Sequence, residues 1–336
     1  MPNEFLSSIN LSRELEVIVE QQTNISLKRY PLATAFLGMC KNVNITDKQI
    51  QGTVKQPLLL SNLKAQRVQQ GDSLSFKTIS EKMSHVPVAQ YSSPVTFISD
   101  LIERLKTEET KSDTLEFMSE LKAQYQEVTD SIYEGITADL QAPTTVDKGI
   151  SSLAHICNDN SFQGVDPVDV PEWKALKMSS SLTPVQLIEL SNPRSTETRI
   201  FQDVFQELFN EIGTYGRTNL CVVGRNIFNI ISLSSKIHGA PAMQISIDKI
   251  LYGGITYILG HLMPKNEVYA LDTDKLGLGL NNSKLKNAPL EKDLNKHETY
   301  VMNPYIGAVL TCKQRNSQAL LTFTNIDPLN IEPMIA

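Results

Sequence analysis

The sequence predicts an α+β chain with two packed domains and two extended appendages. Three observations lead to this class. Residues 55–82 have the pattern of a long hairpin, residues 112–140 have the pattern of one long amphipathic helix, and residues 146–300 alternate between helix and strand signals. A chain of 336 residues can bury a full core, as one large domain or as two modest ones.

The first 54 residues are expected to form an arm rather than a part of the core. Residues 10–22 suggest a short amphipathic helix, because leucine, isoleucine and valine supply one apolar side. From Tyr30 to about Leu60 the helical period is lost, and prolines and glycines interrupt the pattern. An arm of this kind usually packs on something else or stays mobile.

Residues 55–82 predict a hairpin that cannot bury itself. It turns at residues 70–72, and its second arm alternates Leu74 and Phe76 with polar residues, which is the period of a half-exposed strand. A lone two-stranded hairpin is marginal in water. The segment carries five basic and two acidic side chains, a net charge of +3. A protruding hairpin with a thin apolar face indicates assembly with another molecule before it indicates catalysis.

Residues 112–140 predict the strongest helix of the chain. Ser112 is a suitable N-cap, and the apolar residues that follow recur three or four positions apart. This apolar stripe consists of Leu115, Met118, Leu121, Tyr125, Val128, Ile132, Ile136 and Leu140. The remaining sides carry seven acids and one base, a net charge of −6. Opposite charge on hairpin and helix suits docking between neighbouring copies; the alternative is that both are simply solvated faces.

The other elements are shorter. Strands are predicted at 85–89 and 95–98, before the long helix. Later in the chain, helices are predicted at 183–190, at 198–212 and near 225–234, and strands at 220–223, 255–258, 267–271, 305–312 and 319–325. The last two strands are joined by a polar turn at 313–316.

Composition excludes several classes of protein. The net charge of −6 argues against a protein built to grip nucleic acid. The N-terminus has no pattern of a secretory signal, and no apolar run approaches the roughly 18 residues of a membrane span. The four cysteines show no CxxC spacing, so buried thiols in a reducing compartment are favoured over disulfides or zinc.

The search for catalytic patterns is largely negative. None of the five histidines has metal-ligand spacing, and the glycines at 277–279 lack the third glycine of a nucleotide loop. Asp272 and Asp274 could hold a divalent cation, but a turn after a strand is the favoured interpretation. Cys221 and His238 could form a nucleophile pair, but a buried inert thiol is favoured. We therefore expect no catalytic, cofactor or metal site and no enzymatic activity.

Three further segments carry a resemblance to a known family. The first is Gly164-Val165-Asp166 followed by Pro171-Glu172-Trp173-Lys174, the second is residues 250–255 with 262–272, and the third is residues 308–316 with 319–321. They are similar to the entry of the axial domain, its late strand and turns, and the closing strand pair of the tailed-bacteriophage major capsid protein. Together with the order of the elements, they make roughly residues 40–326 resemble this Hong Kong 97-type fold.

The resemblance implies both an architecture and a function. The implied parts are an N-terminal arm at 1–54, an extended hairpin loop at 55–82, a peripheral domain with a long spine helix at 83–145, an axial domain at 146–300, and returning peripheral strands at 301–336. The implied function is a coat protein that self-assembles into the icosahedral head shell around double-stranded DNA. That places it in the virion capsid, assembled in the cytoplasm of a bacterial host.

The implied partners are many copies of the same chain in hexamers and pentamers. Because only about 50 residues precede the hairpin, a separate scaffolding protein is expected, together with a portal. A decoration protein is a further partner that such shells accept. The shell would enclose DNA without binding it specifically and would need no membrane. Candidate contacts between copies are Lys64, Arg67, Leu74, Phe76, Lys77, Glu120, Glu127 and Glu134.

Three alternatives remain open. An encapsulin-like nanocompartment shell shares the fold but holds enzymes instead of a genome. A metal-dependent α/β enzyme would use Asp272 and Asp274. A tail or baseplate component would assemble into tubes or rings rather than shells.

Overall fold

The computed structural model describes residues 29–50, 52–59, 82–98, 111–181, 199–237, 243–281, 291–292 and 299–324. The helices there are α2 (Pro31–Met39), α4 (Lys111–Gln141), α5 (Leu153–Ile156), α7 (Arg199–Gly213) and α8 (Arg225–Ile237), with short 3-10 turns η2 (Asp47–Gln49), η3 (Pro171–Trp173), η5 (Thr273–Lys275) and η7 (Arg315–Ser317).

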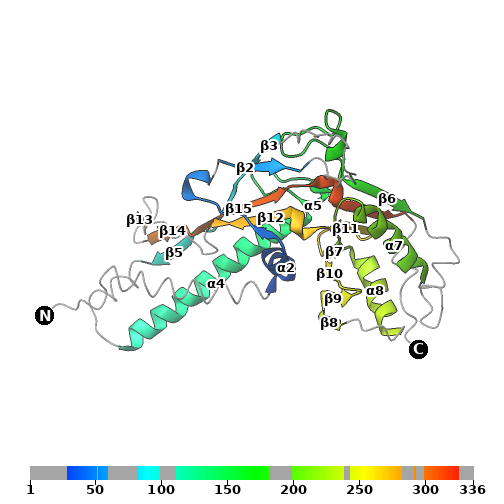
Figure 1. The fold of residues 1–336 in the computed structure, drawn as a ribbon. Helices are drawn as coiled ribbons and strands as arrows, with labels where there is room; N and C mark the ends of the chain where they lie inside the picture. Colours follow the sequence, from blue (N-terminus) through cyan, green and yellow to red (C-terminus); the bar gives the residue numbers. More distant parts are fainter. Residues whose placement is uncertain are drawn as a thin grey trace, which may run out of the picture.

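The described strands fall into four sheets. They are β1 (Lys41–Asn42), β2 (Thr53–Leu58), β3 (Lys82–Pro87), β4 (Ala89–Ser92), β5 (Val95–Ile98), β6 (Leu176–Ser180), β7 (Leu220–Val223), β8 (Met243–Ser246), β9 (Lys249–Tyr252), β10 (Ile255–Leu259), β11 (Glu267–Leu271), β12 (Leu276–Leu280), β13 (Glu291–Lys292), β14 (Thr299–Met302), β15 (Tyr305–Cys312) and β16 (Ala319–Phe323). Two sheets dominate, one with the order β1-β12-β15-β4 and one with the order β6-β16-β11-β7-β10-β9-β8. Figure 1 shows α4 running diagonally below β12 and β15, with α7 and α8 beside the larger sheet.

The long helix α4 confirms the prediction at 112–140 to within one residue at each end. Its buried residues Tyr125, Val128, Ile132 and Leu140 follow the predicted three-to-four spacing and belong to the main core. The side chains earlier in the predicted apolar stripe lie outside the described part. The apolar stripe therefore holds the second half of α4 against the body of the protein.

The expectation that the segment after Tyr30 lacks a helix and lies outside the core is wrong for α2. Leu32 and Phe36 are almost fully buried in the same core as α4. Pro31 sits in the first turn, where a missing N–H has no intrahelical partner to lose. The run is apolar on nearly every side, so it shows no amphipathic period. The helix predicted at 10–22 lies outside the described residues.

The base of the predicted hairpin is an antiparallel pair. β2 and β3 are in register from Thr53 opposite Pro87 to Leu58 opposite Lys82. Side chains of β2 alternate between exposed and buried, as expected for a strand with one covered face. The pairing begins slightly outside the predicted range of 55–82. The turn and the arms that we predict between these strands lie outside the described residues.

The last two strands do not pair with each other, so the predicted closing pair is wrong. β15 pairs with β12 and β4, whereas β16 pairs with β11 and β6 of the larger sheet. The reason is the turn η7, which redirects the chain from one sheet to the other; successive strands are neighbours only roughly two-thirds of the time. Strand pairing thus crosses the boundaries predicted near residues 146 and 300. The division into domains stays a prediction.

The larger sheet forms a second core with α7 and α8. Both helices confirm predictions, and Leu208, Ile212 and Ile227 are buried against the sheet. β7 is buried along its whole length and pairs parallel with β10 and antiparallel with β11. The turn between β9 and β10 uses two glycines with φ of 60° and 79°, a conformation that other residues rarely adopt. The helix predicted at 183–190 lies outside the described residues.

Two glycines of β12 allow a close approach of chain segments. A Cβ atom on Gly277 would lie 2.6 Å from Cγ2 of Val43, and one on Gly279 would lie 2.4 Å from the Val43 carbonyl oxygen. Both contacts are shorter than packed atoms allow. The two glycines therefore lie in a strand and allow Val43 to pack closely against it.

Candidate assembly surfaces

The exposed acids of α4 form the first candidate surface. Glu127 and Glu134 are exposed and lie two helical turns apart, so they project from nearly the same side. We call these two residues the acidic stripe. The side chain of Glu120, one further step of seven residues back, lies outside the described part.

Two other acids of α4 are bound inside the chain instead. Asp130 pairs with Arg29 at the start of α2, with 2.5 Å between Nη1 and Oδ2. Asp139 accepts a hydrogen bond from the hydroxyl of Tyr91 on β4. The Tyr91 hydroxyl in turn accepts from the backbone N–H of Ile150 at 3.1 Å, and burial raises the pKa of Tyr91. The solvated acidic surface is thus narrower than the sequence suggests.

The base of the hairpin forms the second candidate surface. On its outer face Lys55 lies opposite His85, and the neighbouring pair includes Met83, which is 52% exposed. On its inner face Val54 and Val86 are buried against β15. The base is therefore anchored to the body on one side and presents a basic, partly apolar side to solvent. Of the predicted hairpin contacts, the following lie outside the described residues: Lys64, Arg67, Leu74, Phe76 and Lys77.

A third surface was missed by the sequence analysis. Ile247, in the turn between β8 and β9, is 84% exposed, and Leu262 after β10 is 61% exposed. Between them lies an ion pair of Asp248 with His261, 3.6 Å apart. The sequence feature that could have indicated this surface is Ile247, because polar residues are usual in the turn of a hairpin. The β8–β9 hairpin itself was not predicted, so this signal could not be used.

The acidic pair considered for a metal is part of a turn, as favoured. Asp272 caps η5, with Oδ1 accepting from the N–H of Asp274 at 3.1 Å, while Oδ2 accepts from the N–H of Arg217 at 3.1 Å. Burial raises the pKa of Asp272. Both carboxylate oxygens are thus engaged by the backbone. In the described ranges, no group of three or more potential metal ligands comes together.

The cysteines are free thiols, which confirms the expectation that they form no disulfides. Cys221 lies at the centre of β7 and is fully buried, and burial raises its pKa. A thiol held in its protonated form is a poor nucleophile. His238, the partner considered for it, lies outside the described residues. Among the helices that the structure describes, none is both long and apolar enough to cross a membrane.

The segment from Phe162 to Trp173, which contains the glycine–aspartate and tryptophan motifs, folds back on itself. Gln163 and Gly164 have φ of 54° and 73°, and the backbones of Phe162 and Val165 bond to each other across this tight turn. Trp173 is fully buried, and its Nε1 donates to the Phe162 carbonyl at 3.1 Å. The role of these residues in this chain is structural.

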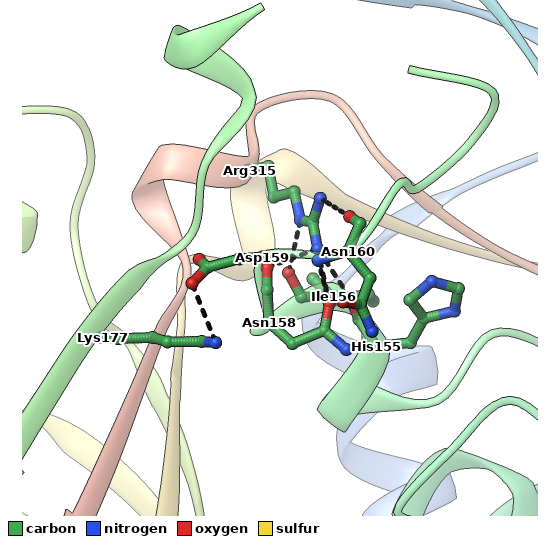
Figure 2. Close-up of polar contacts among 7 residues, drawn as sticks. All are labelled: His155, Ile156, Asn158, Asp159, Asn160, Lys177 and Arg315. Carbon is green, nitrogen blue, oxygen red and sulfur yellow. Dashed lines mark hydrogen bonds and ion pairs between the residues drawn. The ribbon is translucent and has the colours of Figure 1, made fainter. Parts of the chain in front are cut away.

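The ring of Phe162 also packs against a buried arginine, Arg315, which Figure 2 shows with its polar contacts. Arg315 is fully buried, although it belongs to the turn predicted to be polar. Its guanidinium donates to four backbone carbonyls, those of His155 at 2.9 Å, Ile156 at 2.8 Å, Asn158 at 2.5 Å and Asn160 at 2.6 Å. We call the Arg315 guanidinium and the four carbonyls bonded to it the Arg315 cage.

Among the described residues, no carboxylate is bonded to Arg315. The nearby Asp159 pairs instead with Lys177 of β6 at 3.0 Å, on the exposed rim (Figure 2). The ring of Phe162 lies 5.3 Å from the guanidinium carbon and adds a cation–π contact. Burial lowers the pKa of Arg315. In the described part of the chain, the guanidinium is bound by peptide carbonyls, the Asn158 side chain and an aromatic face.

No protein-family model matches the chain, and no curated protein matches it. Solved structures do match. A chain of the capsid asymmetric unit of cyanophage A-1(L) aligns with a TM-score of 0.51 at 13% identity, covering 86% of this chain and 92% of that chain. The capsid of an empty GTA particle aligns with a TM-score of 0.52 at 10% identity, covering 86% and 90%. The capsid of the native GTA particle gives a TM-score of 0.51 at 10% identity. This α+β chain has the Hong Kong 97-type capsid fold.

Proposed function

We propose that this chain is the major capsid protein of a tailed bacteriophage and that it self-assembles into the icosahedral head shell around double-stranded DNA. The observation that carries the proposal is the likeness to capsid chains over 86% of its length. Its site of action would be the virion capsid, formed in the cytoplasm of the bacterial host.

The surfaces of the subunit support assembly between copies. The base of the predicted hairpin is buried on one face and carries Lys55 and His85 on the other, while α4 presents the acidic stripe. Lys64, Arg67 and Lys77 would meet the acids of a neighbour, with Leu74 and Phe76 as the apolar part of the contact. Exposed ion pairs contribute only about 0–1 kcal/mol each, so orientation would come from many copies acting together.

The proposed partners are first of all other copies of this chain. Contacts between unlike surfaces of identical chains close into rings when the rotation between neighbours closes, and the proposed rings are hexamers and pentamers. A separate scaffolding protein and a portal complete the proposed assembly, and a decoration protein is a further candidate. The net charge of −6 suits a wall that encloses DNA without gripping it, because nonspecific binding needs clustered lysine and arginine. No cofactor, enzymatic activity or membrane is part of the proposal.

Negative-stain electron microscopy of the expressed full chain tests the proposal, with and without the other virion proteins. Closed shells that contain DNA are expected. Tubes or rings would instead favour a tail or baseplate component. Shells that contain protein cargo and no DNA would favour an encapsulin-like compartment. A chain that stays a compact monomer under every condition, as measured by small-angle scattering, would contradict all shell functions.

A further inference from the structure

The chain crosses between its two large sheets at two neighbouring places. One crossing runs from β11 through η5 to β12, and the other runs from β15 through η7 to β16. Seven polar residues of the two crossings are buried, with exposed fractions of 0–8%. We call this set the inter-sheet junction: Asp272, Thr273, Gln314, Arg315, Asn316, Ser317 and Gln318. Such a concentration of buried polar groups is costly unless the groups are bonded.

The two crossings are hydrogen-bonded to each other. The backbone N–H of Lys313 donates to the carbonyl of Lys275 at 2.8 Å. The side chain of Gln318 bonds both ways with the backbone of Asp272, accepting from its N–H at 3.0 Å and donating to its carbonyl at 3.3 Å. Each crossing therefore fixes the position of the other.

Two residues of the inter-sheet junction also bind segments that come earlier in the chain. Arg315 holds four carbonyls between residues 155 and 160, at the end of α5 and in the turn that follows it. Gln314 donates through Nε2 to the Tyr215 carbonyl, just after α7, at 3.0 Å. At the end of α4, Oε1 of Gln141 accepts from the N–H of Leu262 at 2.9 Å. The four-stranded sheet with its helix is thus tied to the larger sheet at several points.

The bonds between the crossings favour this arrangement of the two sheets over others. A buried group that loses its partner cannot exchange it for water, so intermediate angles would leave donors and acceptors unpaired. The planar guanidinium also matches four fixed carbonyls in a way that a lysine ammonium with three donors cannot. Such a network specifies a fixed angle between the two sheets.

We propose that the inter-sheet junction, with Arg315 as its positioning residue, sets the angle between the two sheets and thereby the curvature of the shell. This inference rests on the proposed function. The acidic stripe lies on α4 beside the four-stranded sheet, and Ile247 lies at the far end of the larger sheet. A rotation between the sheets changes the angle between these contact surfaces. In a closed shell, a small change of that angle in every subunit changes the diameter.

The first test measures the angle in the subunit and needs no assembly. Spin labels are placed on the full chain at Ser92→Cys and Ile247→Cys, with the half-buried thiol removed as Cys40→Ser. One narrow distance distribution is expected without further changes. Arg315→Lys should broaden or shift that distribution while the far-UV circular dichroism is retained. Gln318→Met, which removes the two side-chain bonds between the crossings at similar volume, should act in the same direction.

The matched control is Lys177→Met. It breaks the exposed ion pair with Asp159 on the rim of the same cage, and the distribution should stay narrow. A broad distribution in the labelled chain before any junction substitution would overturn the proposal, whether or not the variants fold. Unchanged narrow distributions in folded Arg315→Lys and Gln318→Met chains would overturn it as well.

The second test measures the diameter of assembled shells by electron microscopy. The unsubstituted chain should give one diameter, and Arg315→Lys should give several diameters or open sheets under the same conditions. A single unchanged diameter, despite a broadened distance distribution, would refute the link to curvature. Failure of the unsubstituted chain to form any shell would count against the proposed function, while the distance measurement would still decide whether the junction fixes the angle.

Discussion

The inter-sheet junction and the acidic stripe are both polar, yet the fold places them in opposite surroundings. Arg315 is fully buried and satisfied by backbone carbonyls, whereas Glu127 and Glu134 are exposed to solvent. The first set determines how the subunit is built, and the second determines how its surface is charged. Charge content alone therefore does not reveal whether a polar segment serves the fold or the contacts between copies.

The largest expected effect is a loss of stability when the inter-sheet junction is altered, which we do not expect at exposed sites. Arg315→Met leaves the carbonyls of the cage without donors, and each unsatisfied buried group costs about 1–3 kcal/mol, so the free energy of unfolding should fall by several kcal/mol. Urea denaturation measures this change in free energy as a shift of the unfolding midpoint with an unchanged m-value. The matched control is Arg217→Met at an exposed arginine, where a change within about 0.5 kcal/mol is expected. Equal effects at both sites would contradict the assignment.

A smaller loss of stability is expected from close packing beside the junction. In Gly279→Ala the added Cβ would lie 2.4 Å from the Val43 carbonyl oxygen, and such overpacking costs about 1–3 kcal/mol. Gly38→Ala is the control, because its Cβ would meet nothing within 4 Å and alanine suits a helix better. Thermal unfolding should order the variants with Gly279→Ala lowest. A neutral result at Gly279 would show that β1 can move away.

The junction should also respond to pH. Because burial raises the pKa of Asp272, the folded state holds this proton more tightly than the unfolded chain does. The stability that this group contributes is complete below its ordinary pKa and is lost as pH rises through the raised value. The unfolding midpoint of the unsubstituted chain, relative to Asp272→Asn, should therefore decline between acidic and neutral pH. A difference between the two chains that does not vary with pH would argue against a raised pKa.

The smallest effect on stability is expected at the acidic stripe. Reversal of Glu120, Glu127 and Glu134 to lysine should change the free energy of unfolding by no more than about 0.5 kcal/mol per site. Assembly followed by light scattering should be slower at low salt, and the difference should shrink as salt screens the charges. Lys122→Glu on the same helix is the control for helix charge as such. Unaltered assembly and DNA packaging in the reversed chain would remove the stripe from the interface.

Periodic and contiguous elements could be predicted from the sequence. The apolar stripe of α4 and the short apolar run of β7 determine their own structure through local pattern, and both were found with nearly correct ends. α2 was missed because its buried sides leave no amphipathic period and because Pro31 is tolerated in the first turn. Local pattern indicated α4 through its solvated face and β7 through its apolar run, but it missed α2, which shows no amphipathic period.

Long-range pairing and burial could not be predicted. The strand at 319–323 has the composition of either sheet, and only its register with β11 and β6 decides between them. Arg315 stands in a polar turn whose burial depends on the loop at 155–160, far away in the sequence. The exposed Ile247 depends likewise on a hairpin that the pattern did not indicate. Each of these features is created by partners that no local window contains.

The Arg315 cage also has a consequence for protein synthesis. The acceptor carbonyl of Asn160 precedes its donor by 155 positions in the chain. At about 5–20 residues per second, a ribosome exposes that loop roughly 8–30 s before the arginine follows. During this interval the peptide carbonyls can bind only water, so the middle of the nascent chain cannot reach its final form. A chain whose translation stops before Arg315 would therefore lack the hydrogen bonds that hold residues 155–160.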